Sequence, residues 1–162
     1  MKTRIEIRQA TPADLKEILE VFKAAIHHTC QGEYSVSQRK AWAAGSENLD
    51  RWQLALREQY FLVALFQDEI AGFGSLRDGH YLDFLFTNPK YNKLGVATKI
   101  FQDLEEKAMS YHTEELTSDV SFTARPFFER MGFQAVHMNN MEIRGVPIAN
   151  FRMKKPLHYA PE

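Results

Sequence analysis

Residues 87–108, TNPKYNKLGVATKIFQDLEEKA, join the end of a strand to a long helix. Apolar side chains recur four residues apart along the helical part, which predicts an amphipathic helix: Val96, Ile100, Leu104 and Ala108. Its first turn, NKLGVAT, contains a single glycine, Gly95. A helix N-terminus presents unpartnered backbone amides and a partial positive charge, so it can hold a phosphate. The turn is therefore either an anion site or an ordinary helix start, and the remaining sequence has to distinguish the two.

The composition is that of a globular protein, with 44% apolar and 25% charged residues among 162. This length is enough to bury a core, so we expect a single domain over residues 1–162. Because the 20 basic residues are balanced in number by 21 acidic ones, the net charge does not favour binding to nucleic acid or to an anionic membrane. The longest uncharged apolar run, YFLVALF, is too short to span a bilayer. We therefore expect neither nucleic acid nor membrane as a partner.

The N-terminus and the cysteine content indicate a cytoplasmic location. The first residues, MKTRIEIRQ, alternate charged and apolar side chains and lack the apolar centre of a secretion signal. The single cysteine, Cys30, cannot form an intrachain disulfide and fits a reducing compartment.

The first part of the chain reads as a strand followed by helices. Residues 4–10 alternate as a strand does, and a helix follows with Thr11 as N-cap and Pro12 at its first position. Further helices are expected from Ser35 or Ser37 and from about Asp50. Trp42, Trp52 and Phe61 are predicted to be core residues.

The second part reads as strands interrupted by two helices. Strands are expected at residues 60–66, 70–77, 79–87, 114–121, 133–144 and 148–155, the last two joined at 145–147. A short helix is expected from Thr123, its N-cap, to Gly132, its C′ residue. The strand, helix, strand crossover around residues 96–108 implies one parallel pair within the sheet.

These motifs, in this order, resemble the GNAT (GCN5-related) N-acetyltransferase superfamily over nearly the whole chain. LFTNPKYNKLGVATKIFQDLEEKA resembles the family's signature strand, loop and helix, and SFTARPFFERMGF resembles its fourth helix. FLVALFQDEIAGFGSL resembles its usual strand hairpin. The resemblance implies an α/β (α+β) fold: a mixed, mostly antiparallel twisted sheet with a central parallel strand pair, flanked by helices. It also implies acetyl-CoA as cosubstrate and no metal.

The resemblance assigns the NKLGVAT turn to the diphosphate of coenzyme A. The implied cofactor-binding residues are Leu85, Phe86, Thr87, Asn92, Lys93, Leu94, Gly95, Val96, Ala97, Thr98, Ser121 and Phe128. Three of them depart from the family pattern. Asn92 stands where Arg or Gln is common, and Ser121 stands where an asparagine bonds the pantetheine arm. Phe128 replaces a tyrosine that protonates the departing thiolate, and a phenyl ring has no proton to give.

The chemistry implied is attack of an amine on a thioester, which needs a neutral amine, a donor for the oxyanion and a proton route. The family's oxyanion donor is a main-chain amide, here expected near residues 85–87. Strand alternation predicts that Tyr81, Asp83 and Leu85 share one face. Asp83 is a candidate to accept the amine proton and Tyr81 a candidate donor. The alternatives for Asp83 are an exposed strand residue or a partner of a nearby Lys or Arg.

Residues 27–34, HHTCQGEY, are expected to border the acceptor. His28, Cys30 and Glu33 are the candidate substrate-binding residues, with His27 or His28 a candidate base and Tyr34 a replacement acid. A structural role at a helix end is the alternative, and an acyl-enzyme at Cys30 is another. A metal site is disfavoured, because adjacent histidines on a helix point about 100° apart.

The predicted function is transfer of an acetyl group from acetyl-CoA to a primary amine of a small molecule, by direct attack in a ternary complex. One alternative is a non-catalytic acyl-CoA-binding or regulatory module, which Phe128 favours. Another is a dinucleotide-binding protein, against which the absence of G-x-G-x-x-G argues. Exposed strand edges would allow a homodimer.

Overall fold

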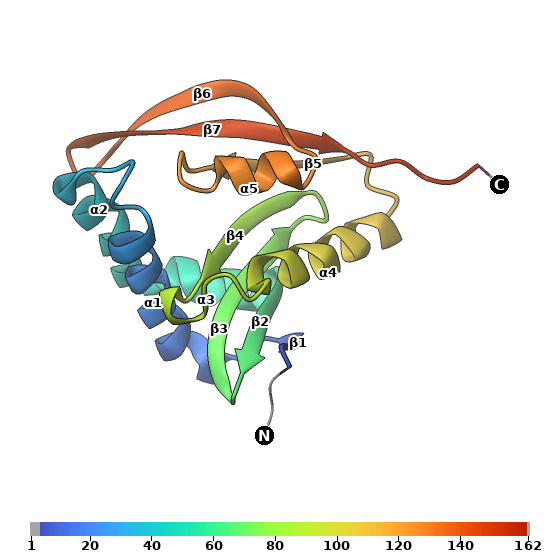
Figure 1. Cartoon of the computed structure of the whole chain (residues 1–162), viewed down its shortest axis with the longest axis horizontal. Helices are drawn as coiled ribbons and strands as arrows, with labels where there is room; N and C mark the ends of the chain where they lie inside the picture. The colour runs from blue at the N-terminus through green and yellow to red at the C-terminus, as the bar shows by residue number, and fades with distance from the viewer. Residues whose placement is uncertain (1–3, 162) are drawn as a thin grey trace.

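The computed structural model describes residues 4–161. Within this range the strands form one seven-stranded sheet in the order β1-β2-β3-β4-β5-β7-β6 (Figure 1). All neighbours run antiparallel except β4 and β5, which run parallel, so the predicted fold class is confirmed. The strands are β1 (Glu6–Gln9), β2 (Tyr60–Phe66), β3 (Glu69–Arg77), β4 (Tyr81–Thr87), β5 (Glu115–Val120), β6 (Gln134–Ile143) and β7 (Val146–Pro156).

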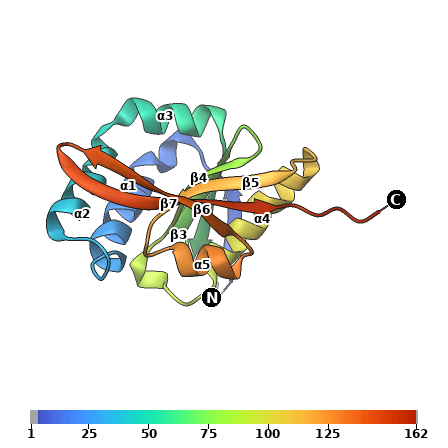
Figure 2. The ribbon, with the colours of Figure 1, turned by 90° about the horizontal axis from the view of Figure 1, so that it is seen from above.

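Helices cover both faces of this sheet, with α1 and α3 on one side and α4 and α5 on the other (Figure 2). The helices are α1 (Leu15–Ala24), α2 (Val36–Ala43), α3 (Leu49–Glu58), α4 (Val96–Ser110) and α5 (Arg125–Arg130). Single turns precede or extend them: η1 (Pro12–Asp14), the π-helical turn η2 (Ala25–Thr29), η3 (Ala44–Glu47) and η4 (Pro89–Tyr91). No helix within residues 4–161 is both long and apolar enough to cross a membrane.

The parallel pair at the centre of the sheet is very short. Tyr81 pairs with Thr117 and Leu82 with Ser118, and the ladder ends there. Beyond that point β4 continues to Thr87 and β5 to Val120, but they separate. This opening in the middle of the sheet lies between the helices of its two faces.

A β-bulge at Asp83 changes which side chains of β4 face which side. Leu82 pairs with Leu76 of β3 and Phe84 with Ser75, so Asp83 has no counterpart. The prediction that Tyr81, Asp83 and Leu85 share one face is therefore wrong for Leu85, whereas Tyr81 and Asp83 line the same cavity. The extra residue inverts the alternation, so Leu85 packs with the α4-side core while Phe84 belongs to the core under α1 and α3.

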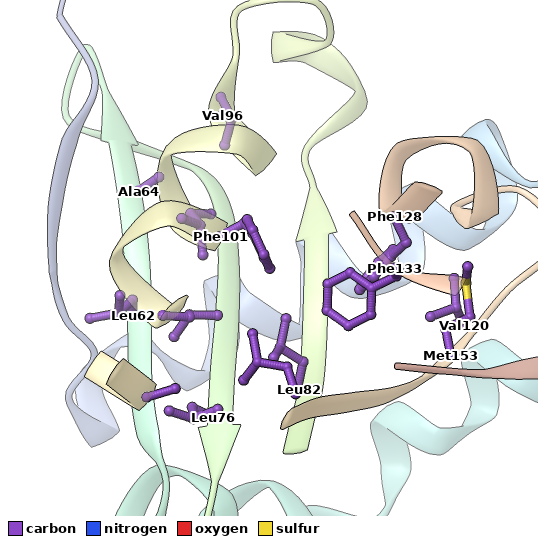
Figure 3. Packing of buried hydrophobic residues seen from close by; sticks show 14 of the residues in the cluster. Leu62, Ala64, Leu76, Leu82, Val96, Phe101, Val120, Phe128, Phe133 and Met153 are labelled. Atoms are coloured by element: carbon purple, nitrogen blue, oxygen red, sulfur yellow. The ribbon is translucent and has the colours of Figure 1, made fainter. Parts of the chain in front are cut away.

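Helix α4 packs closely on β3 because two glycines there leave room for it. A Cβ at Gly74 would lie 2.7 Å from Cγ2 of Ile100, and one at Gly72 would lie 2.7 Å from Cγ1 of Val96. In Figure 3 the buried side chains of this core, Val96 and Phe101 of α4 among them, fill the layer between the helix and the strands. The close approach fixes where the N-terminus of α4 lies.

Several local predictions can be compared with the structure. Thr11 is an N-cap followed by Pro12, as predicted, and Ser35 rather than Ser37 caps α2, its hydroxyl accepting from the amide of Gln38 at 3.2 Å. The prediction of Thr123 as N-cap of α5 is wrong. The Ser121 hydroxyl accepts from the amide of Ala124 there, at 3.0 Å.

The predicted turn at residues 145–147 is also wrong. The turn that joins β6 to β7 is Arg144–Gly145, with Ile143 paired to Val146. Both turn residues have positive φ, as a two-residue hairpin turn requires, so β7 already starts at Val146.

Candidate active site

Two cavities meet where β4 and β5 separate. The α4 cavity, of about 480 Å³, lies at the N-terminus of α4 and beside α5. The α3 cavity, of about 340 Å³, lies between α3, β4, β5 and the start of β7. Three residues line both: Trp42, Phe86 and Ser121. The two cavities are therefore adjacent, and these three residues form part of the wall of each.

The α4 cavity collects nearly all of the residues proposed for cofactor binding. Eleven of those twelve residues line it: Leu85, Phe86, Thr87, Asn92, Lys93, Gly95, Val96, Ala97, Thr98, Ser121 and Phe128. The exception is Leu94, which is 47% exposed and lies outside the lining.

The N-terminus of α4 is built to present main-chain amides to this cavity. Gly95 is the N-cap with φ +79°, a left-handed conformation that favours glycine, and no side chain caps the helix. A Cβ at Gly95 would meet no atom within 4 Å, so the space in front of this turn is open. The first amides of α4 thus lack intrahelical partners and face a cavity lined by Lys93, which suits an anionic group.

Sequence reasoning missed some residues of the α4 cavity, among them Thr123 and Arg130. The Thr123 hydroxyl is buried and has no hydrogen-bond partner within residues 4–161 apart from the adjacent thiol of Cys30. Arg130 is exposed near the end of α5 and adds a second cation to the lining. Helical spacing was the available signal, because residues 123, 127 and 130 fall on one side of a helix.

Phe128 is a packing residue. It is 4% exposed, and its ring lies 5.0 Å from that of Phe133, edge to face. Position 128 therefore offers the α4 cavity an apolar edge and no proton.

Asp83 lies in the α3 cavity within an ion pair. Its oxygens accept hydrogen bonds from both terminal nitrogens of Arg51, at 3.1 and 3.0 Å, and from the side-chain amide of Gln59 at 2.7 Å. The carboxylate side chain is only 5% exposed, whereas that of Arg51 is 45% exposed. The ion pair expected as an alternative role for Asp83 is therefore present, and the carboxylate still lies at the wall of the cavity.

A second carboxylate, Asp119, was missed by sequence reasoning. It accepts hydrogen bonds from Tyr81 at 2.6 Å, from Asn139 at 2.8 Å and from Arg152 at 2.8 and 3.0 Å. Burial would raise the pKa of Asp119, but the hydrogen bonds from Arg152, Tyr81 and Asn139 outweigh it and hold the pKa below its ordinary value. Burial, together with Asp119, raises the pKa of Tyr81.

The Tyr34 hydroxyl bridges two segments that border the opening. It donates to the carbonyl of Ala149 at 2.8 Å and accepts from the amide of Phe122 at 2.9 Å. Its ring stacks on Phe122 with centroids 5.5 Å apart, and burial raises the pKa of its hydroxyl. This bridge connects Phe122, two residues after β5, to Ala149 of β7.

The other predicted acceptor residues are scattered. Cys30 is buried and lines the α4 cavity, and burial raises the pKa of its thiol. His28 and Glu33 are exposed and line neither cavity, and His27 is exposed as well. Across residues 4–161 no three His, Cys, Asp or Glu side chains come together to hold a metal ion.

The aromatic residues predicted as core differ in their roles. Trp52 and Phe61 are 2% and 3% exposed and belong to the core under α1 and α3, as predicted. Trp42 is half-buried: it packs against the core as predicted, but its remaining surface lines both cavities. It lies on α2, against Tyr34 and Phe86, and its remaining surface borders the opening.

Residues 25–155 match the protein-family model of the acetyltransferase (GNAT) domain. The chain belongs to the GNAT acetyltransferase family. A protein named uncharacterized N-acetyltransferase YafP, from Escherichia coli (strain K12), is 39% identical over 155 residues, which are 95% of this chain and 98% of that protein.

Solved structures of other proteins share the fold of this GNAT acetyltransferase. A GCN5-related N-acetyltransferase from Rhodopseudomonas palustris has a TM-score of 0.92 and 30% identity, covering 97% of this chain and 98% of that one. The PaiA N-acetyltransferase of Thermoplasma acidophilum in complex with coenzyme A has a TM-score of 0.77 and 20% identity, over 95% and 99% of the two chains. The second likeness shows the shared fold.

Proposed function

We propose that this GNAT acetyltransferase moves an acetyl group from acetyl-CoA to a primary amine of a small molecule, by direct attack in a ternary complex. The observation that carries the proposal is the junction of the two cavities at Trp42, Phe86 and Ser121. An acetyl donor in the α4 cavity and an amine in the α3 cavity would meet there without crossing bulk water.

The α4 cavity would hold acetyl-CoA. The free amides at the start of α4 would bind the diphosphate, with Lys93 and Arg130 supplying positive charge. The buried Thr123 hydroxyl would serve a polar group of the pantetheine arm. The complex of the Thermoplasma relative with coenzyme A supports this choice of ligand.

Main-chain groups of β4 would stabilise the charge that develops on the thioester oxygen. Residues 85–87 line the α4 cavity, and they lie beyond Leu82, where the β4–β5 ladder ends. An amide there can point at a ligand because no strand pairs with this edge of β4. Such a donor acts most strongly in a site that excludes water.

The α3 cavity would receive the amine and its proton. We propose Asp83 as the proton acceptor, through a water molecule, because its carboxylate lies at the cavity wall. Tyr81 is the candidate donor, held by Asp119. Tyr34 as the acid stays a prediction, and its hydroxyl would have to leave the carbonyl of Ala149 to act.

Two measurements test the proposal. A thermal-shift screen with acetyl-CoA, CoA, NAD and ATP identifies the nucleotide ligand. At about a hundred times its dissociation constant, a true ligand adds about 2.7 kcal/mol to the free energy of unfolding. Stabilisation by NAD but by neither CoA species would refute the cofactor. Release of CoA thiol with primary amines, with detection of the N-acetyl product, tests transfer.

Phe128 favours a second candidate function, a non-catalytic acyl-CoA-binding module. That function predicts stabilisation by acetyl-CoA with no thiol release in a broad amine panel. The same two assays therefore separate it from the proposed enzyme.

A further inference from the structure

The α3 cavity is lined mainly by apolar side chains, and most of these are aromatic. Seven of its eighteen lining residues are aromatic, and Met141, Ile143 and Ile148 add aliphatic surface. Trp42 and Phe86 are half-buried, with ring centroids 6.1 Å apart, and they border the junction with the α4 cavity. An apolar group in this cavity would meet rings close to the point of transfer.

The charges of this cavity are already paired. Asp83 faces the guanidinium of Arg51, and Asp119 faces that of Arg152, each through two nitrogen atoms. The four formal charges sum to zero. Gln59 donates a further hydrogen bond to Asp83, and Tyr81 donates one to Asp119. A second ammonium group or a carboxylate on the acceptor would therefore find no unpaired counter-charge, and burying it unpaired is costly.

We propose that the acceptor is an aromatic monoamine, an arylalkylamine with one ammonium group and no carboxylate. This inference rests on the proposed function and specifies its acceptor. The ring packs against the aromatic wall, and the single ammonium group gives up its proton near Asp83. A cavity of about 340 Å³ is at the small end of the range of ligand sites, which suits one ring with a short chain.

A matched panel of acceptors tests the proposal on the unmodified full chain with saturating acetyl-CoA. Phenethylamine has the ring and one charge, spermidine has several charges and no ring, L-phenylalanine has the ring and a carboxylate, and hexylamine has neither ring nor carboxylate. We expect kcat/KM for phenethylamine to exceed those for spermidine and L-phenylalanine at least tenfold, with hexylamine between. Equal or higher values for spermidine or L-phenylalanine would overturn the proposal.

A variant tests the charge argument separately. Arg51→Gln removes the partner of Asp83, so we expect the ratio of kcat/KM for spermidine to that for phenethylamine to rise at least tenfold. Arg57→Gln, exposed on the same helix α3, is the control and should leave the ratio unchanged. An unchanged ratio in a folded Arg51→Gln protein would refute this reading. If that variant does not fold, the panel on the unmodified chain still decides the question.

A binding measurement separates this inference from the proposed function. Calorimetric titration of the CoA-loaded protein with phenethylamine and with spermidine needs no turnover. Binding of phenethylamine over spermidine without acetylation of either would support the cavity's selectivity and refute the enzyme. Acetylation of spermidine alone, with no binding of phenethylamine, would support the enzyme and refute the aromatic acceptor.

Discussion

The α4 cavity and the α3 cavity are built in different ways. The first depends largely on the main chain of one continuous segment, residues 92–98, with its free amides and its left-handed Gly95. The second depends on side chains brought together from α2, α3, β4, β5 and β7. A main-chain site tolerates substitutions such as Asn92 for a family Arg or Gln. A side-chain site changes its ligand with single substitutions.

Asp83→Asn gives the largest expected effect and tests the side-chain site. Removing the proton acceptor should lower kcat/KM for the amine about 100-fold at neutral pH, because acid–base groups contribute on the order of 10²–10⁴-fold. The loss should shrink as pH approaches the pKa of the amine, where the amine is already neutral. Calorimetry should show unchanged affinity for acetyl-CoA.

Asp50→Asn, exposed on the same helix as Arg51, is the control for Asp83→Asn. A pH-independent loss would assign Asp83 a structural role, and kcat/KM within threefold of the original would remove it from the mechanism.

Gly74→Ala tests the support of the main-chain site. The new Cβ would lie 2.7 Å from Ile100 and 3.1 Å from the carbonyl oxygen of Phe84, so α4 must move away from β3. We expect a loss of about 1–3 kcal/mol in the free energy of unfolding, measured by chemical denaturation. Gly32→Ala is the matched control, because nothing lies within 4 Å of a Cβ there. Equal stability of the two variants would contradict the close packing.

Gly95→Val tests the main-chain site itself. A β-branched residue in the left-handed region costs about 1–2 kcal/mol, which would weaken acetyl-CoA binding about tenfold if the strain is relieved by leaving that conformation. Gly95→Asn, which tolerates the left-handed region, should retain most of the affinity. Unchanged affinity in a folded Gly95→Val protein, measured by calorimetry, would contradict the anion site.

Asp119→Asn gives the smallest expected effect and tests the network around Tyr81. Because the folded pKa of Asp119 is lowered, its stabilisation is present above the unfolded value of about 3.9 and is lost as pH falls through the folded value. The variant should therefore be less stable by about 1–2 kcal/mol at pH 7. This difference should be constant down to about pH 5 and narrow below about pH 4. A difference that does not change down to pH 2 would show that the carboxylate charge contributes nothing.

Local sequence patterns predicted most of the elements, and the resemblance to the GNAT family supplied the residues expected at the α4 cavity. Helical spacing after residue 95 and the crossover between β4 and β5 place the N-terminus of α4 at the centre of the sheet. Eleven of the twelve residues that the resemblance implied for the cofactor line this cavity, nine of them within residues 85–98.

The α3 cavity could not be predicted in the same way. The bulge at Asp83 depends on pairing with β3, and strict alternation along β4 gave Leu85 the wrong face. Asp119 shares no local motif with Tyr81, and only the β4–β5 pairing brings the two together. Trp42 is apolar like a core residue, yet its surface is left at the junction by the opening between those strands.

Initial velocities with both acetyl-CoA and phenethylamine varied test whether the two cavities act together. Direct transfer between a donor in the α4 cavity and an acceptor in the α3 cavity predicts intersecting lines in a double-reciprocal plot, because both must be bound at once. Parallel lines, together with an acetyl group on Cys30 detected by mass spectrometry after incubation with acetyl-CoA alone, would contradict direct transfer.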